Sequence, residues 1–312
     1  IFINDSKKGG CRLTKKGTTF SARRLQKYEA LKTMLKLWRP TLKISEINMD
    51  FYQQLINYRS NQVVMKKGIE TKLAINTIGA DIKVLKTVLH YTYDKKLHTN
   101  DIFKTDDFRS FEEIGEHVYL NDADIDKLWN MKDLPANLEL VRDIFVIGCY
   151  TALRISDLGV LESYNIIENN GKRVLKIIQH KGSEPVFIPI HKRVDLLLQK
   201  YNHIFPKAYA DQTMNDSIKI LCQKAGLKDK QEFKITRGAK VERFVKEKWQ
   251  MVTNHTARRS FATNCVTAGM NPLLVMKITG HKTLKDFMRY VCVTQHQVAL
   301  DMSNRSYFTG KD

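Results

Sequence analysis

The segment from Leu138 to Tyr150 constrains the fold of this chain more than any other. It is nearly all apolar, and a helix that is apolar on all sides is buried in the interior of a protein. No apolar run in the chain approaches the roughly 20 residues that a membrane-spanning helix needs. The segment therefore predicts a helix at the centre of a folded domain, in a protein that does not span a membrane.

The first part of the chain has the apolar periodicity of α-helices. The expected helices begin at Ser21, Ser45 and Thr77 and carry the stripes Leu25, Tyr28, Leu31, Leu35 and Trp38; Ile47, Phe51, Leu55 and Tyr58; and Ile78, Ile82, Leu85 and Leu89. The first of them should end at Arg39-Pro40 because a proline disfavours the helical conformation of the residue before it. These stripes predict a helical domain over residues 21–98, with a flexible basic lead-in at residues 1–20 and an interdomain linker at residues 99–117.

A second domain is expected over residues 118–312, with a C-terminal tail from about residue 291. Asn121 or Asp122 can cap its first helix. Turn residues separate three short apolar runs, which predict a three-stranded antiparallel meander. The expected strands are Tyr164–Ile167, Arg173–Gln179 and Val186–Ile190, and the chain should return to helices after them. The fold class is therefore mainly α (α+β), two helical domains with one small sheet.

The charge of the chain is strongly positive and uneven. Its 52 Lys and Arg residues against 33 Asp and Glu give a net charge of +19, and residues 1–110 alone hold 22 basic and 10 acidic residues. A basic half of this size indicates a polyanionic partner, most plausibly nucleic acid. The alternative is a solvated lysine-rich surface, and an anionic membrane surface is less favoured because no strongly amphipathic terminal helix stands out.

The five cysteines are far apart and form no C-x-x-C pair, which favours a reduced, cytoplasmic protein without a disulfide framework or a zinc ribbon. The chain also has no phosphate-binding G-x-x-x-x-G-K-[ST] motif, no H-E-x-x-H and no G-x-S-x-G. The sequence therefore lacks the motifs that usually indicate ATP hydrolysis, zinc proteolysis or α/β-hydrolase chemistry. No signal peptide is visible, and the absence of a starting Met suggests a fragment or a processed chain.

Reactive residues gather at four places. They are Arg154 after the apolar helix, Lys181 at a hairpin tip, the pair His255-x-x-Arg258, and Gly280-His281 followed nine residues later by Tyr290. Each has an ordinary structural interpretation by itself, such as an arginine at a helix end or a lysine in an exposed turn. Their ordered combination is much harder to explain that way.

This ordered set resembles the tyrosine recombinase (phage integrase) family. The resemblance rests on Thr-Ala-Leu-Arg-Ile-Ser-Asp-Leu, His-Thr-Ala-Arg-Arg-Ser-Phe-Ala-Thr and Gly-His-x8-Tyr, and it runs from about residue 15 to the end. It implies an N-terminal SAM-like core-binding domain, a catalytic domain, and a covalent 3′-phosphotyrosine intermediate. Because the enzyme keeps the energy of the broken bond, the resemblance implies no cofactor, neither ATP nor metal.

The expected roles follow from the chemistry of phosphodiester cleavage. The planar forks of Arg154 and Arg258 suit the two non-bridging oxygens, and His281 can donate to the developing charge. A tyrosine hydroxyl, with a pKa of about 10 in model peptides, needs activation at neutral pH, so Tyr290 is the expected nucleophile with His255 as its base. Lys181 is the candidate general acid for the leaving 5′ oxygen.

Two departures from the family pattern qualify these assignments. Arg259 stands where many relatives have histidine, outside the catalytic set. The hairpin reads His180-Lys181-Gly182-Ser183 instead of the frequent Lys-Thr-Gly-Lys, which leaves Lys176 as a fallback for Lys181. Basic residues outside the catalytic set are candidates for DNA contacts: Arg23, Arg24, Lys83 and Lys86.

The leading function is that of an integrase of a mobile genetic element such as a conjugative transposon, because the lead-in looks like a linker to a preceding arm-binding domain. The alternatives are an Xer-like host resolvase, a type IB topoisomerase-like nicking enzyme and a non-catalytic DNA-binding protein. The expected partners are double-stranded DNA with specific core-type sites, further copies of the chain in a tetramer on paired sites, and accessory DNA-bending proteins. The tail, with Val298, Leu300 and Met302, is expected to dock on a neighbouring protomer or on its own core.

Overall fold

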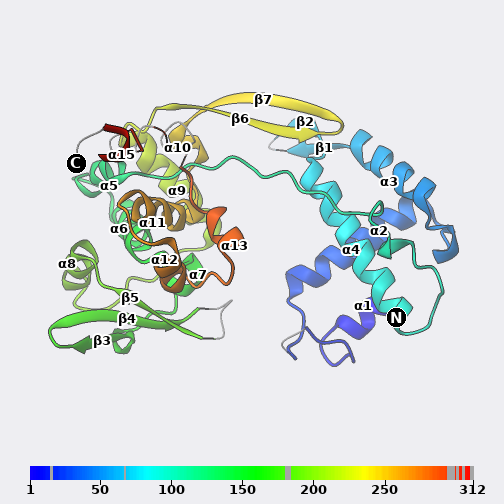
Figure 1. Cartoon of the computed structure of the whole chain (residues 1–312), viewed down its shortest axis with the longest axis horizontal. Coiled ribbons are helices and arrows are strands. Elements are labelled where there is room, and N and C mark those ends of the chain that lie inside the picture. Colours follow the sequence, from blue (N-terminus) through cyan, green and yellow to red (C-terminus); the bar gives the residue numbers. More distant parts are fainter. Residues whose placement is uncertain are drawn as a thin grey trace. The chain divides into compact units, whose positions relative to one another are not determined.

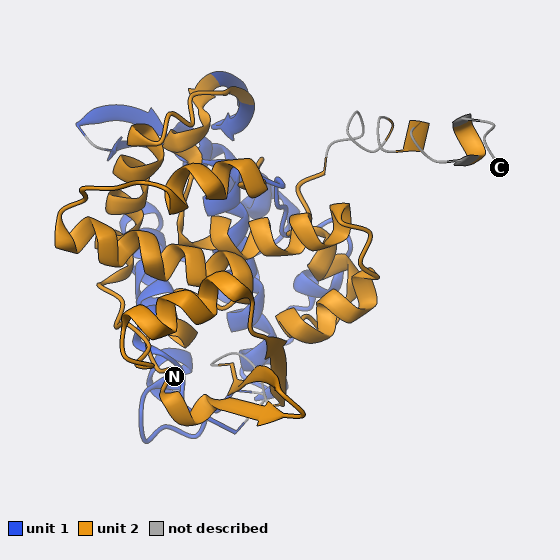
Figure 2. Ribbon diagram, turned by 90° about the vertical axis from the view of Figure 1, so that its left-hand side faces the viewer, with its two compact units in different colours: residues 1–115, 233–244 blue, residues 116–232, 245–312 orange. Residues whose placement is uncertain are grey.

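The computed structural model describes residues 1–14, 17–66, 68–179, 184–293, 299, 302–303 and 306–309. The chain forms two compact units (Figures 1 and 2). Unit 1 consists of residues 1–115 and 233–244, and unit 2 of residues 116–232 and 245–312. The expectation of a mainly helical protein with a small three-stranded antiparallel sheet is confirmed. No helix in the described part of the chain is both long enough and apolar enough to cross a bilayer.

Unit 1 is a helical unit with one core. Its elements in residues 1–115 are α1 (Phe2–Ser6), α2 (Ala22–Trp38), η1 (Ile44–Glu46), α3 (Met49–Asn61), β1 (Val63–Lys66), β2 (Ile69–Lys72), α4 (Ile75–Asp94) and η2 (Ile102–Lys104). The predicted stripes form the core, where Leu31, Phe51, Leu55 and Ile82 are buried together. The helix expected from Ser45 is instead a 3₁₀ turn followed by α3, because the side chain of Asn48 caps the later start by accepting from the backbone N–H of Phe51.

The N-terminal segment, expected to be a flexible lead-in, has side chains that are buried in unit 1. Phe2 and Phe20 are buried, and the guanidinium of Arg12 lies 4.3 Å and 4.4 Å from their ring centroids. Arg12 also donates to the hydroxyl of Ser6. A cation among aromatic rings stabilises a segment without any apolar periodicity, so the sequence pattern gave no sign of this order.

The segment expected to link the domains contributes to the core of unit 1. Phe103 and Phe108 are fully buried there, and the side chain of Asn76 exchanges two hydrogen bonds with the backbone of Glu113. Two aromatic side chains in an otherwise polar stretch are enough to anchor it. Unit 1 therefore continues to Gly115.

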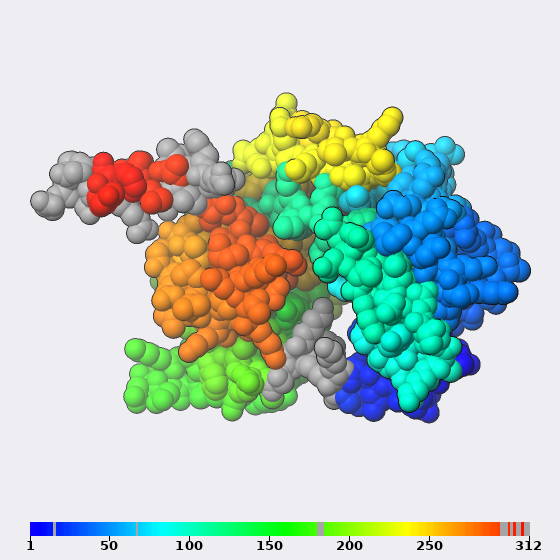
Figure 3. All heavy atoms as spheres, turned by 45° about the vertical axis from the view of Figure 1, so that its right-hand side comes forward, coloured from blue at the N-terminus to red at the C-terminus, as the bar shows by residue number. Residues whose placement is uncertain are grey.

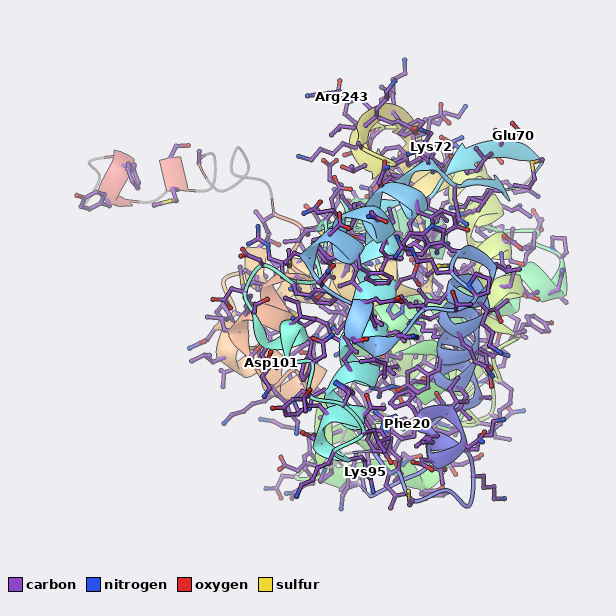
Figure 4. The ribbon with its side chains drawn as sticks, turned by 90° about the vertical axis from the view of Figure 1, so that its right-hand side faces the viewer. Phe20, Glu70, Lys72, Lys95, Asp101 and Arg243 are labelled. Atoms are coloured by element: carbon purple, nitrogen blue, oxygen red, sulfur yellow. The ribbon has the colours of Figure 1, made fainter. Side chains whose placement is uncertain are left out.

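Two short antiparallel hairpins were not predicted. They are β1 with β2, and β6 (Lys230–Arg237) with β7 (Lys240–Glu247), where continued helix was expected. The tip of the second hairpin belongs to unit 1: Gly238, with φ +52°, donates its N–H to the carbonyl of Leu73. Figure 4 shows Glu70, Lys72 and Arg243 of these hairpins at one end of unit 1 and Phe20 at the other. Charged residues interrupt the apolar alternation of these strands, so their pattern in the sequence is weak.

Unit 2 is built around α6 (Ala136–Thr151), the helix that the apolar segment predicted. The other elements before residue 230 are α5 (Asp122–Trp129), α7 (Ile155–Leu158), η3 (Ser163–Asn165), β3 (Ile166–Asn169), β4 (Lys172–Ile178), β5 (Pro185–Pro189), α8 (Lys192–Lys200) and α9 (Asp211–Lys224). The elements after residue 247 are α10 (Lys248–Met251), α11 (Asn254–Thr267), α12 (Pro272–Thr279), α13 (Leu284–Met288) and α15 (Ser306–Thr309).

The packing of unit 2 brings three separate parts of the chain together. Helix α6 lies against α11 at Gly148, where an added Cβ would stand 3.1 Å from the Cβ of Ala257. The predicted meander is present in the order β3-β4-β5, with Leu175 opposite Ile188. Its first strand begins two residues later than expected because η3 precedes it. Helix α12 contacts β5, and the surface of α12 and α13 borders the sheet (Figure 3).

Candidate active site

Arg154 lies where the central helix ends. Ala152 terminates α6 in the left-handed conformation, with φ +57°, and turns the chain so that Arg154 precedes α7. Its Nη1 donates to Oε1 of Gln179 over 2.8 Å and lies 3.8 Å from a carboxylate oxygen of Asp157. Arg154 is thus held between the end of strand β4 and the first turn of α7, with part of its side chain still exposed.

Arg258 is the largest fully buried side chain of the protein's described part, with 0% exposure. It projects from α11 and donates from Nη1 to the carbonyl of Ala152 over 2.7 Å and from Nη2 to the carbonyl of Thr279. Burial and the charge of Arg154 lower the pKa of Arg258 to about 10, so the guanidinium remains charged at neutral pH. The charge of Arg154 disfavours the charge of Arg258, so an anion between the two guanidinium groups would relieve their repulsion.

His281 follows a glycine turn that ends α12. Gly280 adopts φ +71°, and the ring of His281 then lies with Nδ1 2.7 Å from the hydroxyl of Thr279 and Nε2 3.4 Å from Nη2 of Arg258. The Thr279 hydroxyl itself donates to the carbonyl of Met276. This network assigns the proton to Nδ1, with Nε2 as the acceptor facing Arg258. Desolvation is the largest cause that lowers the pKa of His281 to about 4, and the charges of Arg258 and Arg154 lower it further.

Tyr290 lies beside these groups, just after α13. Its ring centroid is 4.7 Å from that of His281 and 5.5 Å from the guanidinium carbon of Arg258. The hydroxyl of Thr263 on α11 donates to the carbonyl of Tyr290 and accepts from the N–H of Cys292. The backbone around Tyr290 is therefore anchored to the helix that carries Arg258.

His255 lies one turn before Arg258 on α11 and is exposed. The pKa of His255 is lowered mainly by loss of part of its hydration and, to a smaller extent, by the charges of Arg259 and Arg154. The neutral imidazole is therefore the form favoured at neutral pH. The structure thus brings together five of the six predicted catalytic residues: Arg154, His255, Arg258, His281 and Tyr290.

The sixth, Lys181, lies outside the described residues. Its fallback, Lys176, is exposed on the face of β4 opposite to Leu175 and Ile177, and its ammonium lies over the ring of Phe187. Gln179 lies on the core-facing side of this alternation and contacts Arg154. Lys176 therefore points away from the arginine pair.

The four predicted DNA contacts have different surroundings. Arg23 and Lys83 are exposed, and Arg24 is exposed with its Nε donating to the hydroxyl of Tyr28. Lys86 is half-buried and its ammonium donates to the carbonyl of Phe108. Lys86 therefore ties α4 to the segment after η2.

Sequence reasoning missed Gln179 and Thr279, which connect the predicted residues to one another. Gln179 donates from Nε2 to the carbonyl of Thr279 and accepts from Arg154. Gln179 and Thr279 are each a buried polar residue at the end of an apolar element. The alternation of Leu175, Ile177 and Gln179 was the available signal, because it places a polar amide on the core side of the strand.

Among the described residues, no group of three or more His, Cys, Asp or Glu side chains is arranged to hold a metal ion. The donors around Arg154 and Arg258 are guanidinium and imidazole groups, which suit an anion. A cavity of about 610 Å³ lies beside His281, and its lining includes Gln179, Gly280, Lys277, Lys282 and the acidic Glu184.

Residues 118–297 match the model of the phage integrase family. The chain belongs to this family. The model of the phage integrase SAM-like domain matches residues 11–111 of the same chain. The resemblance inferred from the sequence is thereby confirmed, and with it the expectation that this phage integrase family member is a tyrosine recombinase.

Curated relatives of this family member include the tyrosine recombinases XerD of Listeria monocytogenes serotype 4b (strain F2365) and of Listeria innocua serovar 6a. Each is 25% identical over 222 residues, which cover 70% of this chain and 72% of the relative. The integrase family fold also recurs in solved structures. The Tn1549 transposon integrase in complex with circular intermediate DNA has a TM-score of 0.60 at 17% identity, covering 91% of this chain and 94% of that one.

Two further structures have the same fold. XerH bound to palindromic difH substrate has a TM-score of 0.61 at 15% identity, over 90% of this chain and 77% of that one. A lambda integrase dimer bound to a core site has a TM-score of 0.62 at 13% identity, over 87% of this chain and 89% of that one.

The depressed pKa of His281 predicts an acid-sensitive contribution to stability. An unfolded histidine takes up its proton near pH 6.5, whereas folded His281 does so only near pH 4. Between these values the unfolded chain binds more protons, so this contribution is present above pH 6.5 and is lost as the pH falls toward 4. Wild-type protein should therefore lose more thermal stability between pH 7 and pH 4.5 than His281→Gln. Equal losses in the two melting series would contradict this assignment.

Proposed function

We propose that this protein is a site-specific DNA recombinase, the integrase of a mobile genetic element, which cleaves and rejoins DNA strands through a covalent 3′-phosphotyrosine. One observation carries the proposal: Arg258, His281 and the ring of Tyr290 lie against one another in unit 2, and the charge of Arg154 acts on both Arg258 and His281. Such a cluster suits a phosphodiester, whose two non-bridging oxygens can each accept from a guanidinium.

In the proposed reaction, the tyrosine oxygen of Tyr290 attacks the phosphorus and forms an ester with it. The bond from phosphorus to the 5′ oxygen breaks, and Lys181 gives that oxygen a proton. His255, held neutral by its lowered pKa, takes the proton of the tyrosine. A DNA hydroxyl reverses the sequence by attacking the phosphotyrosine, so neither hydrolysis of a nucleotide nor a metal is required.

The arginines and His281 stabilise the charge that develops on the phosphate. Arg258 keeps its fork fixed through two backbone carbonyls, so its remaining N–H groups are oriented before the substrate binds. For Nε2 of His281 to donate to a phosphate oxygen, the Thr279 hydroxyl must turn from Met276 and donate to Nδ1. Thr279 would thereby set the tautomer of His281.

Unit 1 would bind the DNA beside the cleavage site as the core-binding domain, and unit 2 would be the catalytic domain. The basic charge of unit 1 supports this role. Residues 1–110 have an excess of basic over acidic residues, and the segment 233–244 of the same unit adds one acidic residue and four basic ones, Lys234, Arg237, Lys240 and Arg243. Arg23, Arg24 and Lys83 are exposed and available to phosphates, whereas Lys86 holds a backbone carbonyl. With DNA as its substrate and five unpaired cysteines, the protein would act in the cytoplasm.

The experiment that tests this function traps the covalent intermediate. Nicked duplexes that cover the DNA on both sides of the protein's own gene are incubated with the full chain and resolved on denaturing gels. A mobile-element integrase should form a covalent adduct on a duplex from an end of its element. The second candidate, an Xer-like host resolvase, is favoured by the identity to XerD, and it should form the adduct on another chromosomal site. No adduct on any host DNA would overturn both.

We further propose that the protein assembles as a tetramer on two DNA duplexes, with accessory DNA-bending proteins as additional partners. The tail would leave its own catalytic domain and bind a neighbouring copy. Val298 and Leu300 of this tail lie outside the described residues, whereas Met302, Tyr307 and Phe308 are exposed. Exposed apolar side chains favour association with a partner that buries them.

Deletion of residues 296–312 should therefore weaken synapsis and recombination much more than binding to a single site. Gel shifts with one duplex and sedimentation of complexes with two duplexes measure the two properties separately. If the shortened protein assembles paired complexes as well as the full chain, the tail has no role between protomers.

A further inference from the structure

Gln179 is a buried amide at the edge of the proposed phosphate site. It follows β4 on the side of the strand that faces the core, and its side chain is only 3% exposed. A buried amide is costly unless its polar atoms are hydrogen-bonded. The two hydrogen-bond partners of Gln179 indicate its role, because both belong to segments that carry predicted catalytic residues.

The two hydrogen bonds of Gln179 join Arg154 to the turn before His281. Nη1 of Arg154 donates to Oε1 over 2.8 Å, and Nε2 donates to the carbonyl of Thr279 over 3.2 Å. A guanidinium can only donate and a carbonyl can only accept, so the partners fix one orientation of the amide. No residue with a shorter or an apolar side chain can bridge these two groups in the same way.

The Thr279 carbonyl is shared with Arg258. Nη2 of Arg258 donates to the same oxygen that Gln179 contacts. The next residue is Gly280, where an added Cβ would stand 3.1 Å from Oε1 of Gln179. Gln179 therefore packs against the backbone that leads into His281, and one side chain links both arginines with the histidine turn.

We propose that Gln179 is a positioning residue for DNA cleavage, holding the fork of Arg154 toward the phosphate. The proposal rests on the proposed recombinase function. The competing partner of Arg154 is Asp157, whose carboxylate oxygen is 3.8 Å away. Without the amide, Arg154 would turn toward this carboxylate. A misplacement of about 1 Å in a catalytic group can cost about 10²-fold in rate, so the loss should appear in cleavage.

The first test compares Gln179→Met with wild-type full-length protein. Methionine keeps the length and the volume of the side chain but makes neither hydrogen bond. We expect single-turnover cleavage of a nicked substrate to fall about 10²-fold, while DNA affinity stays unchanged. Ser260→Ala is the matched control, because Ser260 is a fully buried polar residue of the same unit whose hydroxyl donates to the carbonyl of Thr256 and accepts from the N–H of Leu120. It should lower thermal stability without this loss of cleavage.

The second test separates positioning from a merely structural role. If Gln179 acts through Arg154, the double variant with Arg154→Lys should cleave no more slowly than Arg154→Lys alone. Additive losses for Gln179→Met would overturn the proposal.

Gln179→Leu covers the case in which Gln179→Met does not fold. Leucine makes neither hydrogen bond and adds no charge beside the phosphate, so cleavage should again fall, without additivity to Arg154→Lys. Wild-type rates in both variants would contradict the inference. A wild-type chain that forms no covalent adduct would instead refute the recombinase function itself, so the two failures are distinct.

Discussion

Tyr290→Phe should abolish strand cleavage and leave DNA binding nearly intact. The substitution removes only the attacking oxygen, since phenylalanine keeps the ring beside His281 and the buried Phe287. The positive charge that attracts DNA is also unchanged. The amount of covalent adduct on denaturing gels measures cleavage, and the dissociation constant from native gels measures DNA binding. Both experiments use the same labelled duplex.

Tyr307→Phe is the control for this experiment. Tyr307 is 88% exposed on α15 and is the next tyrosine in the chain after Tyr290. Its variant should form the adduct at the wild-type rate. If Tyr290→Phe still becomes attached to DNA, the nucleophile is another residue, and Tyr307 is the first to examine.

Arg258→Lys should slow single-turnover cleavage by about 10²–10³-fold although it keeps the charge. Arg258 donates from two nitrogens to the carbonyls of Ala152 and Thr279, and an ammonium cannot reproduce this planar arrangement while also holding a phosphate. Leaving a buried carbonyl without its donor costs about 1–3 kcal/mol of stability, so the rate is measured well below the melting temperature of the variant. Arg154→Lys should act in the same direction.

Arg259→Lys is the matched control, one residue along the same helix. Arg259 lies 5.5 Å over the ring of Tyr290, outside the predicted catalytic set. Its effect should be much smaller than that of Arg258→Lys. Equal losses would show that the effect is not specific to the fork of Arg258, and near wild-type cleavage by Arg258→Lys would refute the assignment of Arg258 as a phosphate clamp.

The parts of the fold that were predictable are those with strong apolar patterns. Helix α6 extends only a few residues beyond the predicted segment, because burial on every side demands an unbroken apolar run. The β6–β7 hairpin was missed because lysine and glutamate fill most of its exposed positions. The order of the N-terminal segment was missed because one arginine among aromatic rings, Arg12, holds it.

The sequence indicated the residues of the candidate site but not the contacts between them. Motif order singled out Arg154, Arg258 and His281, because a resemblance records which residue types recur together. The bonds that orient them join distant positions: Arg258 contacts Ala152, 106 residues away, and Gln179 contacts Thr279, 100 residues away. Only the packing of α6, α11 and β4 brings these partners together.

The most direct test of the account is the position of the covalent bond to DNA. Wild-type protein is trapped on a nicked duplex, digested with a nuclease and then with trypsin, and the peptides are analysed by mass spectrometry. Trypsin cuts after Lys and Arg, so Tyr290 lies in a peptide that ends at Arg305 and Tyr307 in a separate one that begins at Ser306. We expect the nucleotide mass on Tyr290. A nucleotide on any other residue, or none on any peptide, would contradict the central claim.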